Sequence, residues 1–269
     1  MSVGVPVLRA LPVPMLGGRR SLLLVERNVW ASRGMWLVLV SGVFEPVLYL
    51  LALGVGVGDL VGTVPVAGRD VPYEVFVAPA MLASAAMNGA VYESTGNVFY
   101  KLKWARTYDA VLATPLEPGD VALGELLWAL IRGALYSAAF VLVMAVMGLV
   151  ESWWGLLMLP AAALVGFAFA AVGLAAVTYM RSWSDFDLVL LATLPLFLFS
   201  ATFVPIGDYP ASVRWLVELS PLTQAVQLMR GLSLGDIGPF MLVNVAYLSR
   251  MGLAGLWVAS RRFARLLIK

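Results

Sequence analysis

Six long apolar stretches, separated by shorter polar segments, run along the chain between residues 35 and 260. A helix needs about 20 apolar residues to cross the roughly 30 Å hydrocarbon layer of a bilayer. The pattern therefore predicts six transmembrane helices, at residues 35–57, 74–95, 119–149, 155–179, 186–204 and 239–260. The third stretch is longer than one crossing requires, so we expect it to begin in the cytosol or to tilt.

The first 33 residues differ from these stretches because arginines are mixed with hydrophobic side chains. Arg19, Arg20 and Arg27 surround the apolar run 22–25. We expect residues 1–33 to form a short tail and an amphipathic helix in the inner membrane interface, ahead of one membrane domain at 34–269. A signal peptide is the alternative, and it is disfavoured because the following apolar run is too long and lacks a clear small-residue cleavage site.

The composition agrees with a membrane protein. Hydrophobic residues make up 61% of the chain and charged residues 13%, with a mean hydropathy of +0.90. So few charges cannot cover a water-soluble domain of this size, whereas lipid can replace that polar shell. We expect an all-α integral membrane protein without a soluble catalytic domain. The chain has no Cys and no His, which excludes disulfides, thiolate metal sites, cysteine nucleophiles and histidine bases.

The cations are distributed unevenly between the two sets of connecting segments. With the N-terminus in the cytosol, 13 Lys and Arg residues fall in cytosolic segments and 3 in outer segments. Cytosolic segments of membrane proteins carry an excess of these residues. The count predicts a multi-pass membrane protein with both termini in the cytosol, and we expect it in the bacterial plasma membrane.

Two connectors are too long to be simple turns, a cytosolic one at 96–118 and an external one at 205–238. The external segment mixes apolar runs with prolines, and non-helical backbone persists at membrane depth only where it is buried in protein or faces water. It is either a lid over the exit of a transport route or a plain interfacial loop. No internal repeat is evident, so the inverted-repeat architecture of many secondary transporters has no support.

Several segments match one transporter family in order and spacing over essentially the full chain. They are Glu45 and Pro46 with the following LYLLALGVGVG, Glu93 at the end of the second span, KLKWARTYDAVLATPLEPGDVALGELLW at 101–128 and LSPLTQAVQLMRGL at 219–232. On these segments the chain resembles the permease subunits of type-2 ABC exporters (ABC-2 permeases). The resemblance is to the branch of the nodulation-factor lipo-oligosaccharide exporter and the daunorubicin-resistance permease.

The resemblance implies six spans, short outer-leaflet helices between spans five and six, and two permease copies, for which a homodimer is expected. It also implies a cytosolic ABC ATPase bound to each copy, and export of an amphipathic or lipidic cargo such as a lipo-oligosaccharide, a glycolipid or a drug. This chain lacks the G-x-x-x-x-G-K-[ST] loop that cradles phosphates. We therefore expect no catalytic, cofactor or metal site in it, with ATP and Mg bound by the partner. Membrane lipid is a further partner, and nucleic acid is not.

The cytosolic connector is the candidate ATPase-coupling segment. Its aromatic and basic residues alternate, and they are Phe99, Tyr100, Lys101, Lys103, Trp104, Arg106 and Tyr108. A short amphipathic helix of this kind suits a cleft of the ATPase and moves with it as a rigid element. The alternative is an ordinary basic interfacial helix held by anionic lipid.

Three ionisable residues, Glu45, Arg132 and Arg250, fall near the middle of the expected spans. A lone charge at that depth costs at least about 2.5 kcal/mol on insertion scales. We expect Glu45 to pair with Arg132 or Arg250, either lining the transport route or its gate, or fixing helix register as a buried ion pair. Glu93 and Glu125 lie near the inner ends of their spans. They contact the basic connector or a cytosolic gate, or are solvated helix ends.

The candidate cargo surface consists of aromatic side chains on span five, Phe197, Phe199 and Phe203, for which ordinary packing is the alternative. Two rival functions remain. An ion-coupled secondary transporter without an ATPase has little support, because acids are sparse in the spans. An intramembrane enzyme lacks paired carboxylates at metal-binding spacing. ATP dependence of efflux and divalent-metal-dependent turnover distinguish these rivals from an ATP-driven exporter.

Overall fold

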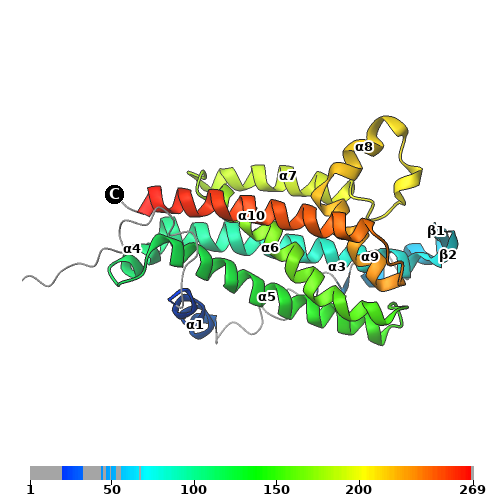
Figure 1. The fold of residues 1–269 in the computed structure, drawn as a ribbon, viewed down its shortest axis with the longest axis horizontal. Helices are drawn as coiled ribbons and strands as arrows, with labels where there is room; N and C mark the ends of the chain where they lie inside the picture. Colours follow the sequence, from blue (N-terminus) through cyan, green and yellow to red (C-terminus); the bar gives the residue numbers. More distant parts are fainter. Residues whose placement is uncertain are drawn as a thin grey trace, which may run out of the picture.

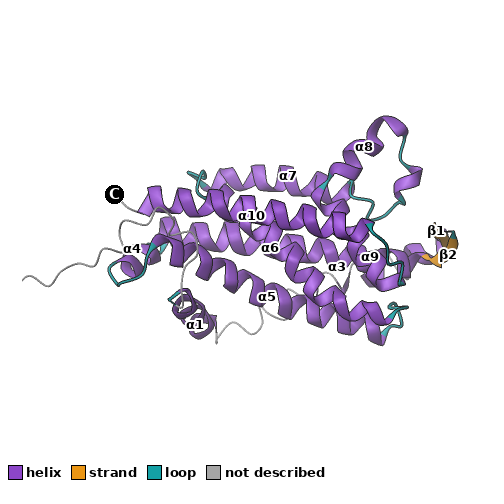
Figure 2. Cartoon of the chain, in the orientation of Figure 1, coloured by secondary structure: helices purple, strands orange, loops and turns teal. Residues whose placement is uncertain are grey.

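The computed structural model describes residues 20–32, 44, 47–48, 50–52, 56–66 and 68–267. Its helices lie side by side in an elongated bundle (Figures 1 and 2). One end of the bundle carries α4 (Thr107–Leu112), α1 (Ser21–Ser32) and the C-terminus, and we call it the α4 end. The opposite end carries strands β1 (Thr63–Val66) and β2 (Arg69–Pro72), and we call it the hairpin end.

Four helical segments of the described residues are long and apolar enough to cross a membrane: Tyr73–Trp104, Pro118–Val146, Trp153–Val177 and Phe240–Leu267. They contain α3 (Tyr73–Tyr92), α5 (Pro118–Val146), α6 (Met158–Val177) and α10 (Phe240–Leu267). These four match the second, third, fourth and sixth predicted spans. The first predicted span, 35–57, lies largely outside the described residues, so the count of six stays a prediction.

The fifth predicted span, 186–204, is wrong as one continuous helix. Helix α7 (Phe186–Leu198) has only 13 residues and includes Pro195, which has no N–H for the helical ladder. After it the backbone of Ala201 takes a φ of 56°, a left-handed conformation that is costly for a residue with a Cβ. The helix therefore ends at Leu198, and the chain reaches α8 (Ala211–Leu219) and α9 (Pro221–Leu234) through an irregular segment.

The second predicted span also differs from the expectation, because its helix runs on past residue 95. Two π-helical turns follow α3, η2 (Glu93–Asn97) and η3 (Tyr100–Trp104). The helix then breaks at Arg106, whose φ is 45°. Only the six residues of α4 remain from the separate short helix expected in the 96–118 connector.

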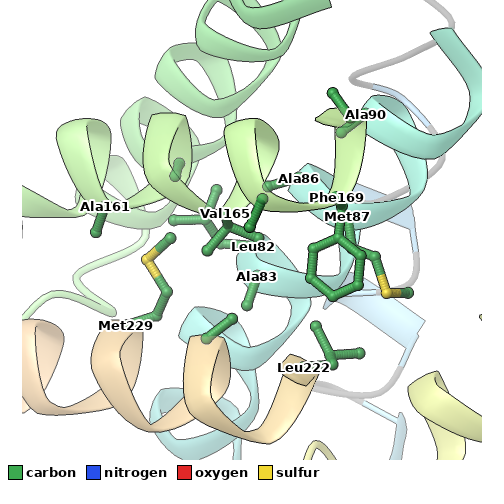
Figure 3. Close-up of a cluster of buried hydrophobic side chains, with 14 of the residues drawn as sticks. Leu82, Ala83, Ala86, Met87, Ala90, Ala161, Val165, Phe169, Leu222 and Met229 are labelled. Atoms are coloured by element: carbon green, nitrogen blue, oxygen red, sulfur yellow. The ribbon is translucent and has the colours of Figure 1, made fainter. Parts of the chain in front are cut away.

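Helix α6 is the centre of the bundle and packs on α3, α5 and α10. Glycines let the helices approach closely, since a Cβ on Gly255 of α10 would lie 2.8 Å from the backbone carbon of Ala171 in α6. Figure 3 shows part of this core, where Leu82 and Met87 of α3 and Phe169 of α6 meet Leu222 and Met229 of α9. Helix α9 is therefore part of the buried core.

The β-hairpin was not anticipated, and it is a small addition to a structure that otherwise agrees with the all-α expectation. Strands β1 and β2 are antiparallel, with Thr63 opposite Pro72 and Val66 opposite Arg69. Val64 and Val71 face each other and are buried, which is the period-2 pattern of a strand with one covered face. Arg69 fixes the hairpin to the bundle by donating to the carbonyl of Leu234, at 3.1 Å.

Candidate functional site

The aromatic residues of the 96–118 connector divide into buried and exposed pairs. Phe99 is 2% exposed, and its ring lies 5.3 Å from the rings of both Trp183 and Phe186. Tyr108 is 1% exposed and packs edge-on against Phe263 of α10. Tyr100 and Trp104, in contrast, are 53% and 65% exposed. A partner protein can therefore reach Tyr100 and Trp104, whereas Phe99 and Tyr108 anchor the connector inside the bundle.

The basic residues of the connector divide in the same way. Lys103 and Arg106 are exposed at the α4 end. Lys101 points inward, with its side chain only 12% exposed, and its Nζ lies 2.7 Å from Oε2 of Glu125. The ion pair joins η3 to α5. This is the contact between Glu125 and the basic connector that the sequence analysis gave as one of its alternatives. The role of both residues stays a prediction.

A groove separates α1 from the connector at the α4 end. It encloses about 470 Å³, and its lining combines apolar side chains with two cations, Arg27 and Arg106. Helix α1 forms one wall of the groove. It is held there by close packing on α5 at Gly124, where a Cβ would lie 2.8 Å from the Cβ of Leu24. Arg20 links the two walls by donating to the carbonyl of Pro115, at 2.9 Å.

Asn28 of α1 completes a buried polar cluster around Glu125. Its amide donates to Oε2 of Glu125 at 3.4 Å, and its Oδ1 accepts from Nζ of Lys101 at 3.2 Å. Burial, together with the neighbouring Glu125 carboxylate, raises the pKa of Tyr108 well above its usual value. The cluster thus connects α1, the connector and α5 within a few ångströms.

Arg132 of α5 forms an ion pair with Glu93 of η2. Asn97 donates to Oε2 of Glu93 at 2.9 Å, and Nη2 of Arg132 donates to the hydroxyl of Tyr136 at 2.6 Å. Glu45, the partner expected from the sequence, lies outside the described residues. Sequence reasoning named Glu93 and Arg132 separately but did not pair them.

Arg250 and the span-five phenylalanines are not brought together with these charges. Arg250 is exposed on α10, and the described part of the chain contains no ion pair of its guanidinium. Phe197 and Phe203 contact each other edge-on, with ring centroids 5.2 Å apart. Phe199 is 58% exposed. The structure places one of the three candidate cargo residues on the surface and pairs the other two.

Arg230 of α9 is a buried cation at the hairpin end that sequence reasoning did not single out as a site. Its Nε donates to the carbonyl of Phe76 at 3.2 Å and its Nη2 to the carbonyl of Ala201 at 3.0 Å. The guanidinium also lies 3.6 Å from the centre of the Phe76 ring. Burial lowers the pKa of Arg230 to about 9, which still leaves it protonated at neutral pH. In the sequence, the only indication of this buried role is that Arg230 is the single cation among the mostly apolar residues of α9.

Comparison with known proteins adds to this geometry. The profile of the ABC-2 type transporter family matches residues 20–234. Nodulation protein J of Rhizobium leguminosarum bv. trifolii is 36% identical over 200 residues, which cover 73% of this chain and 74% of that protein. The proteins of the same name from R. leguminosarum bv. viciae and Sinorhizobium fredii are 33% and 35% identical, over 82% and 78% of this chain and 84% and 79% of their own lengths.

Proposed function

Because the chain belongs to the ABC-2 type transporter family, we propose that it is the membrane-spanning permease of an ATP-driven exporter. It is a multi-pass membrane protein and the transport component, and hydrolysis of ATP takes place in a separate cytosolic ATPase. Two copies of the permease form one transporter. The cargo is an amphipathic or lipidic molecule, of the lipo-oligosaccharide, glycolipid or drug class.

The proposal places the α4 end in the cytosol. The 13 cations expected inside include those of α1, the connector and the end of α10, all at this end. The 3 expected outside are Arg69, Arg214 and Arg230. They belong to β2, α8 and α9, which lie at or near the hairpin end (Figure 1). Such an excess of cations is typical of the cytosolic side.

The ATPase docks on an exposed surface that we call the docking surface, made of Tyr100, Lys103, Trp104 and Arg106. It adjoins the groove between α1 and α4. Exposed aromatic and arginine side chains are the residue types that dominate binding energy at protein interfaces. The observation that carries the proposal is the family match, which spans the connector, together with two large aromatic side chains left accessible beside two cations.

The test is co-purification in a gentle detergent from the native host, with the proteins that accompany the permease identified and counted. We expect one ATPase per permease from the unaltered chain. The amount of ATPase that co-purifies should fall about tenfold or more in Trp104→Ala, which is the effect of losing one interface hot spot. Trp153→Ala is the matched control, since Trp153 is 90% exposed at the opposite end. The control variant keeps the ATPase.

Two other outcomes contradict different parts of the proposal. If no ATPase accompanies the permease, even after crosslinking, a self-contained transporter replaces the exporter. If the ATPase is present but Trp104→Ala and Tyr100→Ala both retain it, the docking surface is wrong and the exporter stands.

A further inference from the structure

Two ion pairs cross between the same two antiparallel helices. The helix that begins as α3 runs from the hairpin end toward the α4 end, and α5 runs back. Glu93 pairs with Arg132, and Lys101 pairs with Glu125. The order of charges is reversed between the two pairs, because the acid is on the α3 side in one and on the α5 side in the other.

The first π turn, η2, makes this double pairing geometrically possible. On α5 the partners are seven residues apart, an interval that returns to nearly the same face, with a drift of about 20°. On the other helix the interval from Glu93 to Lys101 is eight residues, which in a straight α-helix would turn the second side chain about 80° away. A π turn bonds i to i+5 and so takes in an extra residue. Because η2 lies between Glu93 and Lys101, the eight residues act as about seven and Lys101 returns to the face of Glu93.

Both ion pairs are largely buried, and each makes further hydrogen bonds to neighbouring side chains. The side chains of Glu93 and Glu125 are 5% and 1% exposed, and those of Arg132 and Lys101 are 13% and 12% exposed. Asn97 and Tyr136 bond to the first pair. Asn28 bonds to both members of the second pair and so brings α1 into the network.

A contribution to folding stability does not by itself explain why the helices are joined by two buried ion pairs. Buried ion pairs are often matched or exceeded in stability by apolar side chains of similar volume, and their best-attested use is to specify one register. π turns, which are rare and mostly occur at functional sites, point the same way. The network lies directly behind the docking surface, since Lys101 is in the same π turn as Tyr100 and Trp104.

We propose that Glu93, Lys101, Glu125 and Arg132, with Asn28, lock α1, η3 and α5 into one rigid unit that carries the motion of the bound ATPase into α5. They are positioning residues for transport and do not touch cargo. The proposal rests on the proposed function for the source of the motion, whereas the rigidity of the unit is a property of the permease alone.

The rigidity is tested on the purified permease by spin labelling, which is clean because the chain has no cysteine. Leu22→Cys and Leu135→Cys place labels on exposed positions of α1 and of α5. We expect a single narrow distance distribution for this pair. Lys101→Gln and Glu125→Gln broaden or split it. The charge exchange Lys101→Glu/Glu125→Lys restores it, and the control Ser137→Ala, a buried polar side chain on α5, leaves it unchanged.

The transmission is tested in the complex with the ATPase, with labels on α5 and α10 at Leu135→Cys and Leu253→Cys. A non-hydrolysable ATP analogue shifts this distance in the unaltered and charge-exchanged chains. In Glu125→Gln the ATPase remains bound and its turnover stays within about twofold, but the shift is lost, as expected for loss of coupling between sites. A narrow distribution in both neutralised variants overturns the rigid unit.

Three further results also decide the matter. If the neutralised variants fail to insert, the charge exchange must insert and give the narrow distribution, and its failure overturns the proposal. If the ATP analogue does not shift α5 in the unaltered complex, the transmission is wrong. If no ATPase binds, the proposed function fails, while the distance measurement on the permease alone still decides the rigid unit.

Discussion

The two ends of the bundle hold buried charge in different ways. At the α4 end two largely buried cations face carboxylates on another helix, as Lys101 meets Glu125 and Arg132 meets Glu93. At the hairpin end Arg230 donates to two backbone carbonyls and rests on the Phe76 ring. Paired side chains can be removed or exchanged together, whereas backbone acceptors cannot be mutated away. The α4 end should therefore tolerate compensating changes that the hairpin end does not.

The largest effect is expected from Arg132→Leu, because it leaves the Glu93 carboxylate buried without its cation. Breaking one side of a buried pair costs about 3–5 kcal/mol of unfolding free energy. The double variant Arg132→Leu/Glu93→Leu should recover most of this loss, since both charges are gone. Thermal unfolding of the purified protein measures both. A double variant as unstable as the single one would show that the two residues do not act as a pair.

Arg230→Met comes next, because it leaves the carbonyls of Phe76 and Ala201 without this donor. We expect a loss of about 3 kcal/mol, since each buried unsatisfied group costs about 1–3 kcal/mol and some relaxation follows. Arg230→Lys should lose less, as it keeps a cation over the ring. Protease cleavage within 199–210, measured against time, reports whether the irregular segment has been released. Unchanged cleavage in Arg230→Met would contradict this anchoring role.

Gly124→Ala tests how α1 is attached at the α4 end. The new Cβ would lie 2.8 Å from the Cβ of Leu24 and 3.0 Å from the carbonyl oxygen of Ser21, so α1 must shift. Overpacking of this kind costs about 1–3 kcal/mol. Gly133→Ala, on the same helix with nothing within 4 Å, is the matched control and should be neutral or better. Equal effects of the two variants would show that α1 does not pack there.

The smallest effect is a difference in pH dependence between two tyrosines. Burial, with Glu125 nearby, raises the pKa of Tyr108 well above 10.0, and burial also raises the pKa of Tyr209 at the hairpin end. An unfolded chain releases the phenol proton near pH 10, whereas the folded chain keeps it to a higher pH. The free energy of unfolding therefore falls as the pH rises from about 10 toward the pKa of the tyrosine in the folded protein. Tyr108→Phe should remove more of this loss than Tyr209→Phe. Tyrosinate absorbance and melting temperature between pH 9 and 11 measure it, and equal slopes would contradict the difference in burial.

Four of the six predicted spans are present as long apolar helices, because hydropathy is a sum over neighbouring residues and needs no tertiary contact. The same local reasoning placed a helix near Leu22 and Trp30, where α1 lies. It failed for span five, because the conformation of Ala201 depends on Arg230 and on the packing of 200–202. The β-hairpin was missed because four-residue strands give too short a pattern to recognise.

The candidate site shows the same division. The sequence determined which residues of the connector and spans carry charge or aromatic rings, and it brought attention to Glu93, Glu125 and Arg132. Only the tertiary structure decided that Arg132 meets Glu93, that Tyr108 is buried while Trp104 is exposed, and that Arg230 is an anchor. The physical reason is that charge and hydropathy belong to each residue, whereas pairing and burial depend on the register between helices, which packing and the π turn η2 set.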